Sequence, residues 1–435
     1  MVLAASRWQN WAGNQAAEPQ RVITPRSAGE VAEAVTLATL DGLPVRMTGS
    51  GHSFTPVALT TGVMLRPGGL RAVRAVDAAA GEVTAEAGCR LRDLNEQLHA
   101  RGLALANMGD IQEQTVAGAI QTGTHGTGRD LGGIAMQVTA LEMVLADGSI
   151  VSCSADQSAD LFQAARIGLG ALGVLTAVTF RVVPAFLLTA REEPMSWAEV
   201  IARLDELASD NEHFEFYWFP HTDGCLTKRN NRSDGPPRPL PRWRHRLDDE
   251  FLSNTVFGAT CRLGQRYPAV IPAINGLAGR ALGARTYTDA AYRVFTSPRR
   301  VRFKEQEYAI PREHLAGALT AIRALFARHD WRVSFPIEVR VAPADDVWLS
   351  TAYGRPTAYI AIHVFHTAPH EEYFREVEAV MTAIGGRPHW GKLHTRDAAY
   401  LRDAYPRFDD FVTLRDELDP ARRFGSPYLE QILGS

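Results

Sequence analysis

Lys392 lies in the segment GRPHWGKLH, residues 386–394, which satisfies all but the last position of the phosphate-binding pattern G-x-x-x-x-G-K-[ST]. Chemically the match is poor, because Leu393 replaces the magnesium-binding hydroxyl residue and Pro388 has no backbone N–H to offer a phosphate. The run before it, YFREVEAVMTAIGG, has helical spacing, whereas a phosphate loop follows a strand. The sequence therefore disfavours a nucleotide triphosphate site and leaves Lys392 in need of another role.

A second group of charged residues stands in FPIEVRV, residues 335–341. Strand alternation puts Glu338 and Arg340 on the same face of one strand. They could form a cross-strand salt bridge at the surface or a charged pair inside a pocket. His363, in AIHVF, also has two interpretations: it is either an ordinary strand histidine or a residue that contacts a ligand.

Two loops rich in glycine and hydroxyl residues each lie next to strand-like segments. GSGHSF, residues 49–54, directly follows the strand-like PVRMT, and TVAGAIQTGTHGTGRDLGG spans residues 115–133. Glycines let backbone N–H groups approach an anion closely, so the pair suits a pyrophosphate, although two ordinary flexible loops would look similar. GLGALG, residues 168–173, matches the dinucleotide pattern in letters, but a helical run precedes it and a strand-like run follows. Because that order is reversed, we do not expect a Rossmann fold there.

The composition is that of a globular protein, and its 435 residues predict more than one domain. The net charge of −3 gives no reason to expect nucleic acid or an anionic membrane as a partner. No N-terminal signal and no long apolar run is evident, so we expect a cytoplasmic protein without stable membrane insertion. The four cysteines are widely spaced, which predicts reduced, mostly buried thiols rather than metal ligands.

The order of predicted elements indicates an α+β fold. Ser27 is the expected N-cap of a helix that ends near Gly42, and Asp147-Gly148 is the expected turn of a hairpin over residues 138–154. The pattern changes at Pro184. Beyond it, strands and helices mix without strict alternation, which predicts an antiparallel sheet with helices on one face. We expect the Pro- and Arg-rich stretch 228–250 to be a solvated surface excursion rather than a binding loop.

Taken together, the motifs resemble flavoproteins of the vanillyl-alcohol-oxidase type, with an FAD-binding domain of the PCMH type. The resemblance is strongest to sugar-1,4-lactone oxidases and dehydrogenases and to the related alditol oxidases. It rests on WQNWAGN, GSGHSF, TGTHGTG, IGLGALGV, FPIEVR, WLSTAYGR and RPHWGK, in that order along nearly the whole chain. It implies an FAD-binding domain at 1–184, a substrate-binding cap at 185–400 and a C-terminal segment, 401–435, that returns to the FAD domain.

The resemblance also implies the cofactor and its contacts. FAD would be attached covalently through His52, and no cysteine matches a second attachment point. No metal is implied. The expected contacts with FAD are Gly49, Ser50, Gly51, Ser53, Thr115, Gly118, Thr122, Gly123, Thr124, His125, Gly126 and Val174.

The implied activity is oxidation of a sugar lactone, or alternatively of a polyol, with O2 or another redox acceptor reoxidising the flavin. Lys392, Arg340 and Glu338 would be catalytic, the first two stabilising negative charge on flavin and substrate. His363, Asp110, His389 and Gly109 would contact substrate or lie beside it. Asp110 and Phe365 stand where alditol oxidases have serine and threonine, which favours a lactone. The resemblance also places Gly109 where relatives carry a residue that gates oxygen at the flavin, and a glycine there leaves space for O2 and favours an oxidase.

Overall fold

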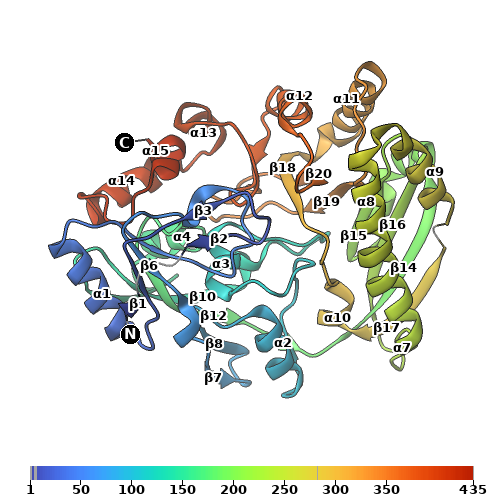
Figure 1. The fold of residues 1–435 in the computed structure, drawn as a ribbon. Helices are drawn as coiled ribbons and strands as arrows, with labels where there is room; N and C mark the ends of the chain where they lie inside the picture. Colours follow the sequence, from blue (N-terminus) through green and yellow to red (C-terminus); the bar gives the residue numbers. More distant parts are fainter. Residues whose placement is uncertain (1, 4–6, 282, 435) are drawn as a thin grey trace.

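In the computed structural model, which describes residues 2–3, 7–281 and 283–434, two groups of strands lie at opposite ends of the molecule (Figure 1). The first sheet has the order β1-β4-β6-β5, and β6 pairs in parallel with both β4 and β5. Its strands are β1 Val2–Leu3, β4 Arg21–Ile23, β5 Val45–Met47 and β6 Val63–Leu65, and helix α1 (Ala28–Leu40) connects β4 to β5. The Ser27 side chain accepts the N–H of Glu30, which confirms the predicted N-cap.

A five-stranded antiparallel sheet adjoins it in the order β11-β10-β12-β8-β7. The strands are β7 Val73–Asp77, β8 Glu82–Glu86, β10 Val138–Val144, β11 Ile150–Ser154 and β12 Val174–Arg181. The predicted β10–β11 hairpin is confirmed, and its turn needs glycine because Gly148 has a φ of 84°. Helix α4 (Ala159–Ala165) precedes GLGALG and β12 follows it, so the reversed order that argued against a Rossmann fold is real.

Shorter elements connect these sheets. They are β2 Trp8–Gln9, β3 Ala16–Ala17, β9 Leu103–Ala104, β13 Val183–Pro184, α2 Leu91–His99 and α3 Val116–Gln121. Helix α3 is capped by Thr115, whose side chain accepts the N–H of Gly118.

An eight-stranded sheet forms the other end, in the order β17-β14-β16-β15-β19-β20-β18-β21 with every neighbouring pair antiparallel. Its strands are β14 Leu187–Ser196, β15 His213–Trp218, β16 Gly224–Ser233, β17 Arg285–Ala290, β18 Phe303–Pro311, β19 Ile337–Ala342, β20 Thr357–Phe365 and β21 Arg387–Pro388. The α+β class and the antiparallel sheet predicted for this part are confirmed.

The two faces of this sheet differ in polarity. One face buries alternate apolar residues such as Phe216, Val339 and Ile360 against α5 Trp197–Ala202, α6 Leu204–Ser209, α11 Leu315–Arg328 and α12 Glu371–Thr382. The opposite face carries the intervening residues, among which Glu215, Glu338 and Arg340 are buried. Buried charges are costly unless they are paired, so this face must hold ion pairs or a polar ligand.

The expectation that residues 228–250 form a solvated surface excursion is wrong for residues 228–233 and holds for the exposed segment 234–241. Residues 228–233 complete β16, which lies inside the sheet, and residues 242–250 begin a long helix. The charged side chains are compatible with a central strand because cross-strand carboxylates pair with them, as Lys228 does with Glu215 at 3.4 Å and Arg232 with Glu212 at 2.9 Å.

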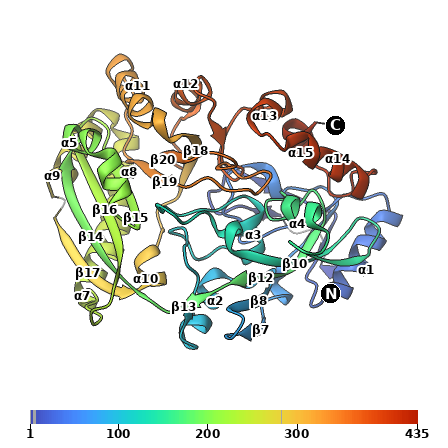
Figure 2. The same ribbon diagram turned by 180° about the vertical axis from the view of Figure 1, so that it is seen from behind.

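The long helix runs without a break through α7 Arg242–His245, the π-helical segment η4 Arg246–Val256 and α8 Phe257–Arg266. It is followed by α9 Ile271–Ala281 and α10 Ala291–Phe295. It lies beside β14, β16 and β17, away from the C-terminal helices (Figures 1 and 2).

The C-terminal helices α13 Ala398–Ala404, α14 Phe408–Leu418 and α15 Pro427–Leu433 pack on the N-terminal part of the chain. Phe411 and Ile432 are fully buried there, and the N–H of Val45 donates to the carbonyl of Arg423 at 2.7 Å. Both ends of the chain therefore build one core. Among the described residues no helix combines the length and apolar character that crossing a bilayer requires.

Candidate active site

A cavity lies among the N-terminal loops, with about 920 Å³ of space between the atoms when the adjoining open solvent is included. Its walls come from GSGHSF, from the start of α3 and from GLGALG. The predicted cofactor residues that line it are Gly49, Ser50, Gly51, His52, Ser53, Thr115, Gly118, Thr122 and Val174. Segments more than 100 residues apart in the sequence therefore meet around one space.

Two of these loops touch through glycines. A Cβ on Gly49 would lie 3.0 Å from Thr115 Oγ1 and 3.4 Å from the Cα of Gly118. A Cβ on Gly118 would lie 2.9 Å from the same hydroxyl. Only glycine allows the two backbones to approach this closely.

The GSGHSF loop presents unused hydrogen-bond donors to the cavity. None of the five backbone N–H groups from Gly49 to Ser53 donates to another described residue. Backbone N–H groups at cavity walls require an acceptor, and successive N–H groups of a glycine-rich turn form a concave anion site. The φ of 74° at Gly51 is part of that turn.

A buried arginine fixes the walls of the cavity. Arg46, on β5, donates to the carbonyls of Leu169 at 2.8 Å, Gly170 at 2.9 Å and Phe424 at 2.8 Å. It thereby ties GLGALG to the C-terminal segment. Burial lowers the pKa of Arg46 to about 10, so the side chain stays charged.

His52 stands at the edge of the cavity and stacks on Trp11 with ring centroids 5.5 Å apart. Burial lowers its pKa to about 4, and the positive charges of Lys392 and Arg90 act in the same direction. The imidazole is therefore neutral near pH 7, the form in which a ring nitrogen has a free lone pair.

The polar face of the eight-stranded sheet holds a network of buried charges. Arg340 Nε donates to Glu215 Oε2 at 3.0 Å, and its Nη2 forms an ion pair with Glu338. The Tyr217 hydroxyl donates to Glu338 Oε1 at 3.3 Å. The predicted shared face of Glu338 and Arg340 is confirmed, and their ion pair is buried and does not lie at the surface.

Asp110 joins this network from the N-terminal part of the chain. Its carboxylate accepts from Arg299 at 2.6 Å and lies 3.5 Å from Arg340 Nη2. The neighbouring Gly109 packs against the loop at 124–125, where a Cβ would lie 3.0 Å from the carbonyl oxygen of His125.

Lys392 reaches the same face from the turn after β21. Its ammonium forms an ion pair with Glu305 on β18, and Glu305 lies 3.5 Å from Nε2 of His363 on β20. Backbone hydrogen bonds fix this turn to β18 and to the GSGHSF loop. The N–H of Leu393 donates to the carbonyl of Glu305 at 2.9 Å, and the N–H of Phe54 donates to the carbonyl of Gly391 at 2.7 Å. The lysine thus lies between the charged sheet face and the GSGHSF loop.

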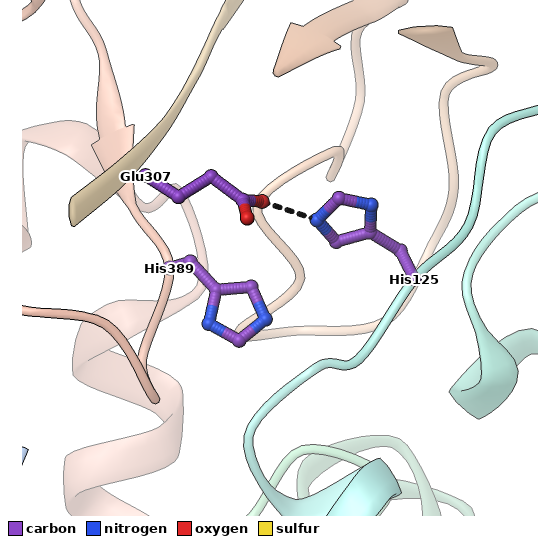
Figure 3. A group of neighbouring side chains, drawn as sticks. All are labelled: His125, Glu307 and His389. Atoms are coloured by element: carbon purple, nitrogen blue, oxygen red, sulfur yellow. Dashed lines mark hydrogen bonds and ion pairs between the residues drawn. The ribbon is translucent and has the colours of Figure 1, made fainter. Parts of the chain in front are cut away.

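His389 belongs to a third buried group with His125 and Glu307, in which the three side chains converge (Figure 3). Nε2 of His125 lies 2.5 Å from Glu307 Oε1. The spacing would suit a metal ion, but Nδ1 of His389 accepts the N–H of Gly391 at 3.0 Å. In the neutral ring the proton is then on Nε2, which leaves no lone pair to bind a metal. The three side chains are better described as a hydrogen-bonded group that holds the turn at Gly391 in place.

Nearby charges set the ionisation of five carboxyl groups that meet in this region, Asp110, Glu215, Glu305, Glu307 and Glu338. Burial raises the pKa of each, but nearby cations outweigh it for Asp110, Glu215, Glu305 and Glu307, whose pKa values lie below the ordinary range. For Glu338 burial prevails over Arg340, because Asp110 and Glu215 add negative charge, and its pKa is raised. Burial works to lower the pKa of Lys392, yet Glu305 and Glu307 leave it above its ordinary value.

The structure brings six of the predicted catalytic and substrate-contacting residues into this charged region, with Gly109 beside it. Gly123, Thr124, His125 and Gly126 lie apart from the large cavity; the first three line a separate cavity of about 270 Å³, and Gly126 packs against Met108. Glu215, Tyr217, Arg299, Glu305 and Glu307 also belong to this region and were not predicted from the sequence. The two acidic residues at alternate positions of FKEQEY were the one signal that could have revealed Glu305 and Glu307 as neighbours on one strand face.

The cavity and the charged sheet face define a flavoprotein of the FAD-binding class. Residues 19–154 match the model of the FAD binding domain. The fold is that of cholesterol oxidase from B. sterolicum, with a TM-score of 0.86 and 18% identity over 100% of this chain and 97% of that one. The free N–H groups and the Gly49–Gly118 approach fit the pyrophosphate of FAD.

Residues 178–432 match the family model of D-arabinono-1,4-lactone oxidase, and the chain belongs to this family. It is 44% identical to L-gulono-1,4-lactone dehydrogenase of Mycobacterium tuberculosis, over 98% of this chain and 99% of that protein. It is 34% identical to L-gulonolactone oxidase of Mus musculus, over 98% of each chain. These matches confirm the resemblance and show that the chain is an FAD-dependent oxidoreductase.

Proposed function

We propose that this protein oxidises the C2 hydroxyl of an aldono-1,4-lactone of the L-gulono, L-galactono or D-arabinono kind to a 2-keto, ascorbate-like product. When bound, FAD supplies the acceptor for the hydride that leaves C2. The observation that carries the proposal is the charged sheet face, where Arg340 pairs with Glu338, whose pKa is raised, and Lys392 reaches the same face through its ion pair with Glu305.

Glu338 is the proposed proton acceptor for the C2 hydroxyl. A general base works best when its pKa lies near the working pH, and Glu338 differs from the other four carboxyl groups in having its pKa raised. Arg340 and Lys392 cannot take this role, because their pKa values are raised and they stay protonated. The two cations instead stabilise the negative charge that develops on the substrate oxygen and the reduced flavin.

Two residues favour a lactone over an open-chain polyol, the alternative substrate. Asp110 is held by Arg299 and Arg340, which leaves its carboxylate little freedom to bind an additional hydroxyl. Phe365 packs with the apolar cluster of Phe303 and Phe335 at the end of β18 and β20. A compact lactone ring fits beside these phenylalanines and the fixed Asp110 carboxylate better than a polyol chain, whose additional hydroxyl groups would be buried without hydrogen-bond partners. His363 and His389 are proposed to contact the substrate or to support the groups that do.

FAD is proposed to lie in the 920 Å³ cavity with its pyrophosphate against residues 49–53 and the start of α3. Covalent attachment through His52 is supported by the neutral imidazole and by the position of His52 at the edge of the cavity. On this view residues 1–184 and 401–435 hold the cofactor and residues 185–400 hold the substrate. The acceptor that reoxidises the flavin, O2 or another oxidant, and a cytoplasmic location stay predictions.

The test uses the purified holoprotein in the absence of oxygen. L-gulono-, L-galactono- and D-arabinono-1,4-lactone are mixed with it separately, with the corresponding alditols as matched controls. We expect at least one lactone to bleach the visible absorbance of the flavin within seconds and to yield a 2-keto lactone. Reduction by alditols with no response to any lactone would contradict the proposal.

A further inference from the structure

In the long helix formed by α7, η4 and α8, the usual distribution of side chains is reversed, with small or polar residues buried and most large apolar ones exposed. Its buried positions carry the small or polar residues Asn254, Gly258, Cys261 and Gly264. A helix on the surface of a globular protein normally buries its large apolar residues and exposes polar ones. Here the inward side is narrow because Gly258 and Gly264 pack closely on Val301 and Ile271.

Apart from Phe257, which packs on Phe335, the large apolar residues of this helix point to solvent. Trp243 is 67% exposed, Phe251 51% and Leu263 47%, and eight of the twelve large hydrophobic residues exposed in the described part of the chain lie between positions 243 and 277. We call this group the apolar stripe; Trp243, Leu247, Phe251, Leu252, Val256 and Leu263 lie on the long helix, Tyr267 directly follows it and Leu277 lies on α9. An exposed concentration of apolar residues marks an interaction surface.

The same helix carries unpaired positive charge. Its 25 residues include five arginines and three acidic residues. All three acidic residues are paired, Asp248 and Asp249 with Arg285 at 3.7 and 3.0 Å, and Glu250 with Arg300 at 2.7 Å. Among the described residues no carboxylate pairs with the exposed Arg242, Arg246, Arg262 or Arg266. The net charge of −3 for the whole chain therefore conceals a local basic surface.

We propose that the apolar stripe and its arginines dock the protein on the surface of an anionic lipid bilayer. Bulky apolar residues beside arginines are the composition of helices that lie in the plane of a membrane interface. Trp243 and Tyr267 stand near the two ends of the stripe, where aromatic side chains favour the headgroup region. No helix in the described residues is suited to span the bilayer, so the helix rests on the surface.

A second copy of the chain is a less suitable occupant. A twofold interface would place the same surface on both sides, which brings the unpaired arginines of one copy against those of the other. Anionic headgroups neutralise the same charges, each basic residue near such a surface gaining a favourable contribution. Charge complementarity thus selects a lipid surface.

The inner side of the helix borders the candidate active site. Cys261 packs with Phe303 and Phe335, and the Asn254 side chain holds the backbone of Pro298 and Arg300, next to Arg299. The apolar stripe lies on the opposite side of the helix and contacts none of the proposed catalytic residues. Substitutions in the stripe should therefore leave oxidation of a soluble lactone unchanged.

The test is flotation of the holoprotein with vesicles of phosphatidylcholine, with and without phosphatidylglycerol. We expect binding to the vesicles that contain phosphatidylglycerol and loss of binding at high salt. Leu247→Glu/Phe251→Glu should lower binding at least about tenfold, since two apolar anchors are lost. Arg242→Gln/Arg246→Gln should weaken binding and flatten its salt dependence. Leu37→Glu/Leu40→Glu, which changes exposed apolar residues on α1, is the matched control and should bind like the parent.

Melting temperature and lactone oxidation are measured for every variant, and both should match the parent. The proposal is overturned if the parent floats with neither vesicle type, or if Leu247→Glu/Phe251→Glu floats as well as the parent. It is also overturned if light scattering finds a dimer in solution that this variant converts to a monomer, because a second copy would then cover the stripe.

Discussion

Replacement of Lys392 by methionine is the sharpest perturbation of the charged sheet face. The ammonium has one direct ion-pair partner, Glu305, and lies near Glu307 and Asp110. A unit charge about 4 Å from a developing oxyanion contributes about 4 kcal/mol at an effective dielectric constant of about 20. Loss of a single such stabilising group from an enzyme typically slows the reaction about 10²–10³-fold. We expect flavin reduction by the lactone to slow by that factor in Lys392→Met.

The single variant also leaves Glu305 buried without its cation, which costs about 3–5 kcal/mol when one partner of a buried ion pair is removed. The double variant Lys392→Met/Glu305→Gln removes both charges and provides the control. If Lys392 serves only to neutralise Glu305, the double variant should recover the parent rate. If Lys392 stabilises charge on the substrate and flavin, the double variant should stay slow while its stability returns.

The assay is anaerobic stopped-flow mixing with lactone, followed by the flavin absorbance, on the parent, the two single variants and the double variant. Melting curves accompany the rates, because the four proteins form a double-mutant cycle for both quantities. A rate for Lys392→Met within about fivefold of the parent, well below the range expected for such a group, would refute the reasoning. So would full recovery of the rate in the double variant.

Three further predictions concern the base, the tether and the cofactor cradle. Glu338→Gln should lower kcat/KM about 10²–10⁴-fold. In the parent, activity should fall as the pH drops through the raised pKa of Glu338, because only the carboxylate accepts a proton, and this acidic limb should be absent from the variant's pH–rate profile. In the denatured parent, flavin colour should remain with the protein, whereas His52→Ala should release it; colour lost from the denatured parent would rule out the tether. Gly118→Val should lose most of its FAD, as measured by absorbance after purification, because a Cβ there already lies 2.9 Å from Thr115 Oγ1. Gly317→Ala, on α11 with nothing within 4 Å of the added carbon, is its control and should keep full FAD content.

Local patterns in the sequence predicted the features that depend on neighbouring residues. Ser27 caps its helix because its side-chain oxygen accepts the N–H of Glu30, three residues later. This hydrogen bond does not depend on where the helix packs in the fold. The Asp147-Gly148 turn forms for the same local reason. Alternation alone placed Glu338 and Arg340 on one face, and the structure adds that this face is buried.

Features that depend on long-range pairing could not be predicted in this way. The contact of Lys392 with Glu305 depends on β21 pairing with the edge of β18, 87 residues away. The charged segment 228–233 resembled a loop because its carboxylate partners are Glu193 on β14, Glu212 just before β15 and Glu215 on β15, and only the pairing of these strands brings them together. The role of Arg46 could not be predicted from local sequence, because it donates hydrogen bonds to the carbonyls of Gly170 and Phe424, which lie in two remote segments.

The most direct test of the proposed function is flavin reduction by L-gulono-1,4-lactone that carries deuterium at C2. If the C2 hydrogen leaves as hydride within this site, anaerobic reduction should be several-fold slower with the deuterated lactone than with the ordinary one, and the product should be the 2-keto lactone. Equal rates of reduction with the two lactones, or a product oxidised at another carbon, would contradict the account.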